Sequence, residues 1–269
     1  MDEGKNRLVL LVDDDEMSRD IFEILLQGIG VSAEKAESGA EALVLVQKKK
    51  YELIFIDHMM PEMDGIETLH NMRQLPENKN QDTPVIALTA NVKVNANAYY
   101  LSEGFNGYLA KPVRPEELEE TICSLLASKN ENAFDLSSEK EEEVLPAVED
   151  FNWEYALSYN LNLENLKRLL KDFTGKLPRQ IEEFSNFEFD VLEEDADLGG
   201  LLKEYRIKVH ALKSNLKSFG NTKLSDCALG LETAAKNEDL AAVLAENPAF
   251  CQKLRKCYEQ LSVLVRDFL

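Results

Sequence analysis

Residues 52–65 read ELIFIDHMMPEMDG, and this stretch decides how the first half of the chain is interpreted. The apolar, β-prone run at 53–56 suits a strand that is buried on both faces, as the strands of parallel sheets are. The run stops at Asp57, and an Asp-Gly pair follows before helical periodicity resumes. Ligands bind at the carboxyl ends of strands in open α/β sheets. A single Asp is also an ordinary strand end or helix cap, so the other strand ends decide its role.

The first 127 residues alternate strand-like and helix-like segments. Strand-like runs lie at 7–12, 31–36, 53–57, 84–88 and 107–110, and each is followed by a segment with helical periodicity. Five β-α units in succession predict a parallel five-stranded sheet with helices on both faces. We therefore expect an α/β domain over residues 1–127.

The rest of the chain has a different pattern. Residues 128–150 are polar and acidic, which predicts a solvated linker. From residue 151 onward strand signals fade, and apolar residues recur at helical spacing. Four amphipathic helices with short connections, the last beginning after Pro248, predict an all-α four-helix bundle over residues 151–269.

Composition narrows the functional classes. A length of 269 residues favours two domains, and a net charge of −20 argues against nonspecific nucleic-acid binding. The four cysteines lack Cys-x-x-Cys spacing, so zinc and redox motifs are not expected. No apolar run is long enough to span a membrane, and the polar N-terminus is unlike a signal peptide. We expect a cytoplasmic protein with reduced cysteines and no membrane insertion.

Reactive residue types follow four of the predicted strands. Asp13 and Asp14 end the first strand, Asp57 the third, Thr89 the fourth and Lys111 the fifth. The carboxyl ends of parallel strands meet at one edge of the sheet, so these groups are expected to converge. Three carboxylates repel one another unless a cation compensates, and hard oxygen ligands favour Mg²⁺. A carboxylate nucleophile, a metal, a lysine and a hydroxyl suit phosphoryl transfer to an aspartate.

Each of these residues alone has an ordinary structural explanation. The acidic run at 13–15 could cap a helix, Thr89 is a common strand residue, and Lys111 could be a surface charge. The conjunction of all four strand ends favours the phosphoryl-transfer site.

These motifs resemble the receiver domain of two-component response regulators. The family pattern is an acidic pair, a phospho-accepting Asp before Met-Pro and Asp-Gly, then Thr-Ala and Lys-Pro. It corresponds here to VDDD at 12–15, IDHMMPEMDG at 56–65, LTA at 88–90 and AKP at 110–112. The resemblance covers residues 5–127 and implies a doubly wound, flavodoxin-like (βα)5 fold.

The resemblance also implies a role for each acidic residue. Asp57 would accept the phosphoryl group and join Asp14 as a ligand of Mg²⁺. Asp13 would act on the metal through water, and the backbone carbonyl of Met59 would supply another ligand.

Three further positions follow from the same resemblance. The peptide bond between Lys111 and Pro112 would be cis. Tyr108 would be the switch aromatic, coupled to Thr89 when phosphoryl is present; the alternative is an ordinary core tyrosine.

Two residues are expected to set how long the phosphoryl group persists. Met59 and Asn91 lie two residues beyond Asp57 and Thr89. Since Met59 has no group that orients a hydrolytic water, we predict a long-lived acyl phosphate.

In the second half, His210 lies on a predicted helix together with basic residues. Arg206, Lys213 and Lys217 share its face, beside the apolar stripe, so we expect an exposed imidazole. These cations suit an imidazole that carries a phosphoryl dianion. The alternative is a surface histidine among solvated bases.

The stretch VHALKSNLKSFG at 209–220 resembles the motif of histidine phosphotransfer (HPt) domains. His210, Leu212, Lys213 and Gly220 match the pattern, whereas Ser214 stands where the family usually has Gly. The resemblance implies that His210 carries a phosphoryl group.

Together these features predict a phosphorelay signalling protein. Asp57 would accept a phosphoryl group from phosphohistidine, and His210 would serve His-Asp transfer, with its own Asp57 or with another protein's. The receiver would catalyse only its own phosphorylation and dephosphorylation, so the chain would not otherwise be an enzyme. Expected partners are a sensor histidine kinase or other phosphorelay proteins, and no nucleic acid. The alternative is a receiver switch whose helical domain is a non-phosphorylated partner-docking module.

Overall fold

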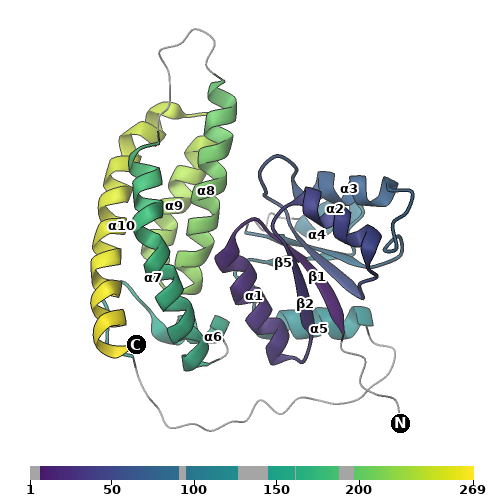
Figure 1. Ribbon diagram of the computed structural model, residues 1–269. Helices are drawn as coiled ribbons and strands as arrows, with labels where there is room; N and C mark the ends of the chain where they lie inside the picture. The colour runs from purple at the N-terminus through teal and green to yellow at the C-terminus, as the bar shows by residue number, and fades with distance from the viewer. Residues whose placement is uncertain (1–6, 91–94, 127–144, 161, 188–196) are drawn as a thin grey trace. The chain divides into compact units, whose positions relative to one another are not determined.

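The computed structural model describes residues 7–90, 95–126, 145–160, 162–187 and 197–269. The chain divides into two compact units, Met1–Glu142 and Glu143–Leu269 (Figure 1). Most of the predicted linker, residues 128–150, lies outside the described residues.

The first unit is built on five parallel strands. They are β1 (Leu8–Val12), β2 (Ser32–Ala36), β3 (Leu53–Asp57), β4 (Val85–Thr89) and β5 (Gly107–Ala110). Their order is β2-β1-β3-β4-β5, which confirms the predicted parallel sheet. All residues of β3 and β4 are buried, as their unbroken apolar sequences require. The register pairs Val12 with Ile56 and Asp57 with Leu88, so the strands carrying the candidate site end at one edge.

Helices cover both faces of this sheet. They are α1 (Glu16–Gly28), α2 (Gly39–Lys48), α3 (Gly65–Gln74), α4 (Ala96–Ser102) and α5 (Pro115–Leu126). Buried residues of α2, α3 and α4 form one core cluster with alternate residues of the strands (Figure 1). On the other face, Phe22 of α1 packs against Phe55 of β3, with ring centroids 4.8 Å apart. Asp15, Ser38 and Asp64 cap α1, α2 and α3 through their side-chain oxygens.

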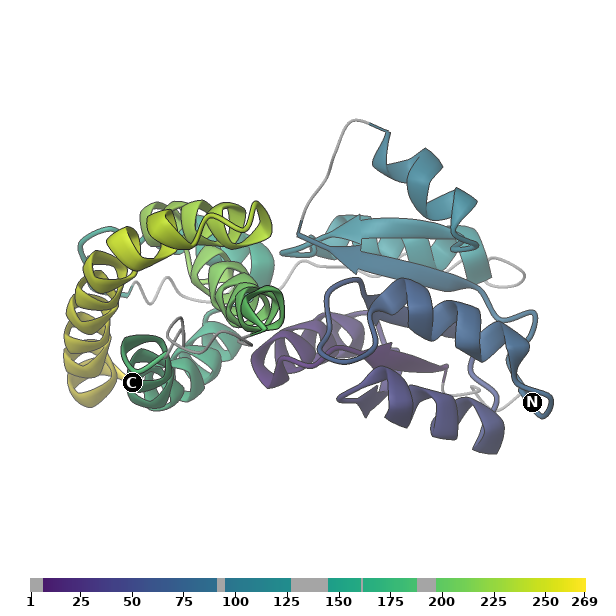
Figure 2. The ribbon, with the colours of Figure 1, turned by 90° about the horizontal axis from the view of Figure 1, so that it is seen from above.

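The described secondary structure of the second unit consists of helices. Its helices are α6 (Trp153–Asn160), α7 (Leu163–Ser185), α8 (Leu198–Ser218), α9 (Thr222–Lys236) and α10 (Leu240–Phe268). α8 packs along α9, and α10 packs on both α7 and α9 (Figures 1 and 2). Leu166, Leu212 and Leu254 are among the residues that bury the apolar stripes of these helices.

The structure corrects one predicted boundary. The last helix was expected to begin after Pro248, but α10 begins at Leu240 and continues through that proline. Asp239 caps the helix by accepting a hydrogen bond from the backbone of Ala242. Val243 and Phe250 are buried on either side of Pro248, so apolar packing holds the helix together where proline removes a donor.

The four cysteines all lie in helices, namely α5, α9 and α10. Cys123, Cys227, Cys251 and Cys257 are all free thiols. Within the described ranges, no helix combines the length and the apolar character that crossing a membrane demands.

Candidate functional site

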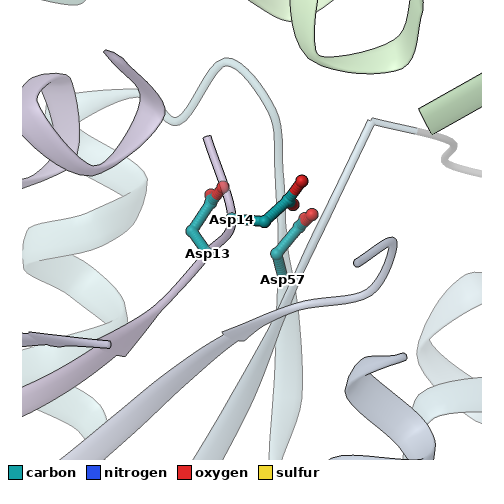
Figure 3. A group of neighbouring side chains, drawn as sticks. All are labelled: Asp13, Asp14 and Asp57. Carbon is teal, nitrogen blue, oxygen red and sulfur yellow. The ribbon is translucent and has the colours of Figure 1, made fainter. Parts of the chain in front are cut away.

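The acidic residues of β1 and β3 meet at the carboxyl edge of the sheet. Asp13 and Asp14 follow β1 directly, and Asp57 is the last residue of β3. One carboxylate oxygen from each lies within 4.8 Å of the others (Figure 3). Asp13 and Asp57 are buried, and Asp14 is half-buried. The structure thus brings the three predicted carboxylates together.

Lys111 joins two of these carboxylates. Its Nζ lies 2.5 Å from Oδ2 of Asp13 and 2.8 Å from Oδ1 of Asp57. The Lys111 side chain is only 7% exposed, so it is not a surface charge. Burial alone would lower its pKa, but the charges of Asp13 and Asp57 outweigh burial and raise the pKa. Lys111 therefore stays an ammonium, and the peptide bond that follows it, to Pro112, is cis.

Asp13 is held by groups from the start of α1. The backbone N–H of Asp15 donates to its Oδ1 at 3.0 Å, and the hydroxyl of Ser18 donates to its Oδ2 at 2.7 Å. The helix cap is Asp15, whose carboxylate accepts from the backbone of Ser18. The capping explanation therefore accounts for Asp15 and not for Asp13. Nothing in the sequence singled out Ser18, because its contact depends on how α1 meets β1.

The cluster carries more negative charge than Lys111 balances. Burial, and then the charge of Asp13, raise the pKa of Asp14 to about 7. A carboxyl group whose pKa is raised in this way is stabilised as an anion when a cation binds beside it. Three converging carboxylates are the donor set that a hard divalent cation such as Mg²⁺ prefers. The residues present fit such an ion.

Thr89 and Tyr108 lie on the neighbouring strands β4 and β5. Thr89 ends β4 and is buried, and Tyr108 is half-buried on β5. Burial raises the pKa of Tyr100, on α4, and the neighbouring Thr89 acts in the opposite direction. The rings of Tyr100 and Tyr108 are stacked with centroids 5.6 Å apart. Sequence reasoning missed Tyr100, since α4 shows no motif that marks it.

Met59 and Asn91 are the two residues expected to control the lifetime of the phosphoryl group. Met59 is half-buried in the loop between β3 and α3. Asn91 lies outside the described residues.

In the second unit, His210 is buried, and this corrects the prediction of an exposed imidazole. The residue is 5% exposed. Its Nδ1 lies 2.7 Å from Oε1 of Glu232 on α9. The periodicity of α8 identifies its faces, but it does not reveal that α9 lies against the face carrying His210. Glu232 was missed for the same reason.

The three basic residues near His210 have different surroundings. Lys213 Nζ lies 2.5 Å from Oε2 of Glu232, so one carboxylate holds both side chains. Lys217 is exposed, and Arg206 is half-buried one turn before His210. The basic group predicted from the sequence is thus partly neutralised.

The Glu232 carboxylate fixes the proton of the imidazole. Burial alone would raise the pKa of Glu232, but the hydrogen bond and charge of His210, together with Lys213, lower it to about 2. An ionised carboxylate only accepts hydrogen bonds, so Nδ1 of His210 must donate. In the neutral ring the lone pair is then on Nε2, which makes no hydrogen bond to any described residue. Nε2 is therefore the ring nitrogen with an available lone pair.

Small side chains let α8 and α9 approach closely. Ser214 and Ser218 of α8 and Ser225 of α9 are all buried. The Ser225 hydroxyl donates to the carbonyl of Lys213 at 3.0 Å. Ser214, where the HPt pattern has Gly, donates to the carbonyl of His210 at 3.1 Å. A serine therefore fits this position.

The backbone conformation at residue 220, just after α8, requires a glycine. Its φ is +82°, and a Cβ there would lie 2.2 Å from the carbonyl oxygen of Asn152. The backbone N–H of Asn152 donates to the Gly220 carbonyl at 3.1 Å, which ties the segment before α6 to the end of α8.

Comparisons with known proteins identify the first unit. The response regulator receiver domain family matches residues 9–123. An uncharacterised 14.6 kDa protein in the sodA1 3′ region of Leptolyngbya boryana is 41% identical over 110 residues, which are 41% of this chain and 82% of that protein. The chain therefore belongs to the response regulator receiver family, and its first unit is a signalling module of two-component systems.

Two further similarities concern proteins from other bacteria. Signal transduction histidine-protein kinase BarA of Escherichia coli K12 is 29% identical over 187 residues, which are 68% of this chain but only 20% of BarA. The receiver domain of sensor histidine kinase PA1611 from Pseudomonas aeruginosa PAO1, solved with a magnesium ion in its active site cleft, has 27% identity and a TM-score of 0.41. That similarity covers 46% of this chain and 99% of the PA1611 receiver chain.

Proposed function

We propose that this protein is a phosphorelay component that accepts a phosphoryl group on Asp57 and carries one on His210. The observation that carries the proposal is Lys111 Nζ, 2.8 Å from Oδ1 of Asp57 within a cluster of three carboxylates. In the first step, the P–N bond of a phosphohistidine donor breaks and a bond forms between phosphorus and a carboxylate oxygen of Asp57. Lys111 neutralises charge on the transferred group, and Thr89 donates a hydrogen bond to it.

The proposed metal ligands are Asp13, Asp14, Asp57 and the backbone carbonyl of Met59, with Asp13 acting through water. A bound Mg²⁺ would supply positive charge to the phosphoryl oxygens. Asp13 is held in place for this role by Ser18 and Lys111.

For the second unit, we propose an HPt domain in which α7 to α10 form the four-helix bundle. The tautomer imposed by Glu232 supports this, because it leaves the Nε2 lone pair of His210 available for attack on phosphorus. In that step the bond from phosphorus to the donor's aspartyl oxygen breaks as the bond to Nε2 forms. Lys213, Lys217 and Arg206 would offset the dianion charge.

The similarity to BarA, a histidine-protein kinase, supports a role in phosphorelay signalling. The receiver match ends at residue 123, whereas the BarA alignment extends over 187 residues and so continues into the second unit. We propose a sensor histidine kinase or other phosphorelay proteins as partners, and a cytoplasmic location. We further propose Tyr108 as the switch aromatic, and 1–127, 128–150 and 151–269 as receiver, linker and HPt domain.

One observation favours a second candidate function. Nε2 of His210 is buried, so phosphorylation requires that this atom become accessible. A receiver switch whose helical domain docks a partner without carrying phosphate needs no such access.

Treatment of the whole chain with acetyl phosphate and Mg²⁺ separates the two candidates. The relay predicts both an alkali-labile acyl phosphate that Asp57→Ala abolishes and an alkali-stable, acid-labile phosphate that His210→Ala abolishes. Acyl phosphate alone, with no phosphohistidine under any loading condition, would favour the docking module.

A further inference from the structure

Ser18 is a side chain of α1 whose hydroxyl reaches the acidic cluster at the edge of the sheet. Its Oγ donates a hydrogen bond to Oδ2 of Asp13 at 2.7 Å. Ser18 is half-buried in the first turn of α1, and its backbone N–H donates to the carboxylate of Asp15 at 3.1 Å. This cap fixes where the turn begins. The start of the helix therefore presents the Ser18 hydroxyl to Asp13.

Protein donors engage both oxygens of the buried Asp13 carboxylate. Oδ1 accepts from the backbone N–H of Asp15 at 3.0 Å. Oδ2 accepts from the hydroxyl of Ser18 at 2.7 Å and from Nζ of Lys111 at 2.5 Å. An ionised carboxylate has about four acceptor sites on its two oxygens. With both sites of Oδ2 taken, the site that remains is on Oδ1.

Lys111 does not hold the Asp13 carboxylate in one orientation by its charge alone. The same ammonium lies 2.8 Å from Oδ1 of Asp57, so it is shared between the ends of two strands. An ammonium is a compact charge with rotatable donors, and it attracts a carboxylate with little preference for direction. The single hydroxyl proton of Ser18, carried by a capped helix, is a directed donor. Ser18 therefore supplies the directional contact to Oδ2.

We propose that Ser18 is a positioning residue that holds the Asp13 carboxylate in the orientation in which its remaining acceptor site serves a water molecule of the bound Mg²⁺. The inference deepens the proposed function and rests on the proposed role of Asp13 at the metal. Ser18 does not touch the cation; it acts through Asp13. Residues that orient metal-binding carboxylates by hydrogen bonds contribute strongly to metal affinity.

The test is the Mg²⁺ affinity of the whole unphosphorylated chain, measured by NMR titration of its backbone amide shifts. Ser18→Ala removes only the hydroxyl, and its dissociation constant for Mg²⁺ should rise about tenfold, as for the loss of a residue that orients a metal ligand. Ser18→Thr keeps the hydroxyl and should restore the wild-type affinity. Ser124→Ala, at an exposed position of α5, is the matched control and should bind Mg²⁺ as wild type does.

Asp13→Ala separates positioning from a general effect on the fold. In that background no carboxylate remains to be oriented, so adding Ser18→Ala should change the Mg²⁺ affinity no further. Equal or tighter binding by Ser18→Ala alone would overturn the inference, as would an undiminished effect in the Asp13→Ala background or an equal loss in Ser18→Thr.

The acidic variants distinguish failure of this inference from failure of the proposed function. If Asp14→Asn and Asp57→Asn both bind Mg²⁺ as wild type does, the proposed metal site fails, and the role of Ser18 fails with it. Binding that requires Asp14 but not the Ser18 hydroxyl overturns only the positioning role.

Discussion

Nδ1 of His210 lies 2.7 Å from Oε1 of Glu232, which joins the candidate phosphoryl carrier of α8 to a carboxylate on α9. The other oxygen of the same carboxylate holds Lys213. Glu232 therefore sets the tautomer of the imidazole and balances the charge of the lysine. It is the residue that makes a buried histidine chemically distinct from an ordinary core side chain.

Glu232→Gln is expected to destabilise the second unit by about 1–3 kcal/mol near neutral pH, because Lys213 loses its buried counter-charge. Urea unfolding followed by Trp153 fluorescence measures this, since Trp153 is the only tryptophan and lies in α6 of this unit. Glu259→Gln, at an exposed position of α10, is the control and should leave the free energy of unfolding unchanged. An unchanged stability in Glu232→Gln would contradict the charge-balancing role.

The same variant has a predicted pH dependence. The pKa of Glu232 is about 2 in the folded protein and 4.5 ordinarily, so the unfolded chain takes up the proton first as the pH falls. Its stabilising contribution is complete above a pH of about 4.5 and is lost as the pH falls towards 2. The difference in unfolding free energy between wild type and Glu232→Gln should therefore shrink at about pH 3. A difference that grows with acidity would have the wrong sign.

Lys111→Met is expected to slow Asp57 phosphorylation by acetyl phosphate roughly a hundredfold, the usual effect of removing one preorganised charge from a developing anion. The reason is that Lys111 Nζ lies 2.8 Å from the Asp57 carboxylate. The rate is measured as acyl phosphate formed over time. Lys50→Met, an exposed lysine of the same unit, should phosphorylate at the wild-type rate. A Lys111→Met rate within twofold of wild type would show that Lys111 does not assist phosphorylation of Asp57.

Asp14→Asn is expected to weaken Mg²⁺ binding at least about tenfold, since one charged oxygen ligand of a hard cation is lost. Calorimetric titration of the unphosphorylated chain measures the affinity directly. Glu52→Gln, an exposed acidic residue beside β3, is the matched control and should bind Mg²⁺ as wild type does. Equal affinity in the Asp14 variant would place the cation elsewhere.

Met59→Asn is expected to shorten the life of the acyl phosphate roughly fivefold, because an amide beside the phosphoryl group can orient a hydrolytic water that a thioether cannot. Loss of label from preloaded protein after removal of acetyl phosphate gives the rate. Met59→Leu keeps an apolar side chain and should dephosphorylate as wild type does. No acceleration in Met59→Asn would rule out Met59 as a determinant of lifetime.

The first unit could be predicted closely from the sequence because its signals are local. Unbroken apolar runs identify buried strands such as β3 and β4, and a parallel sheet brings their carboxyl ends to one edge. The convergence of Asp13, Asp14 and Asp57 follows from that geometry. Ser18 and Tyr100 could not be predicted, because their contacts depend on how α1 and α4 sit on the sheet.

The second unit was less predictable because helix periodicity identifies a face but not its neighbour. The pattern of α8 indicated an exposed His210, whereas α9 covers that face and supplies Glu232. Pro248 suggested a helix start, but a cap at Asp239 and buried residues on both sides of the proline extend α10 across it. Tertiary packing overrides the local signal in both cases.

The most direct test of the central claim follows phosphoryl transfer between two variants of the whole chain. His210→Gln is loaded on Asp57 with radiolabelled acetyl phosphate, freed of the donor, and mixed with Asp57→Asn in the presence of Mg²⁺. A relay from Asp57 to His210 predicts alkali-stable label on the peptide containing His210 of the acceptor, and none when the acceptor also carries His210→Gln. Label that stays on Asp57 or is released only as inorganic phosphate, both in this mixture and in the wild-type chain loaded in the same way, would contradict a relay from Asp57 to His210.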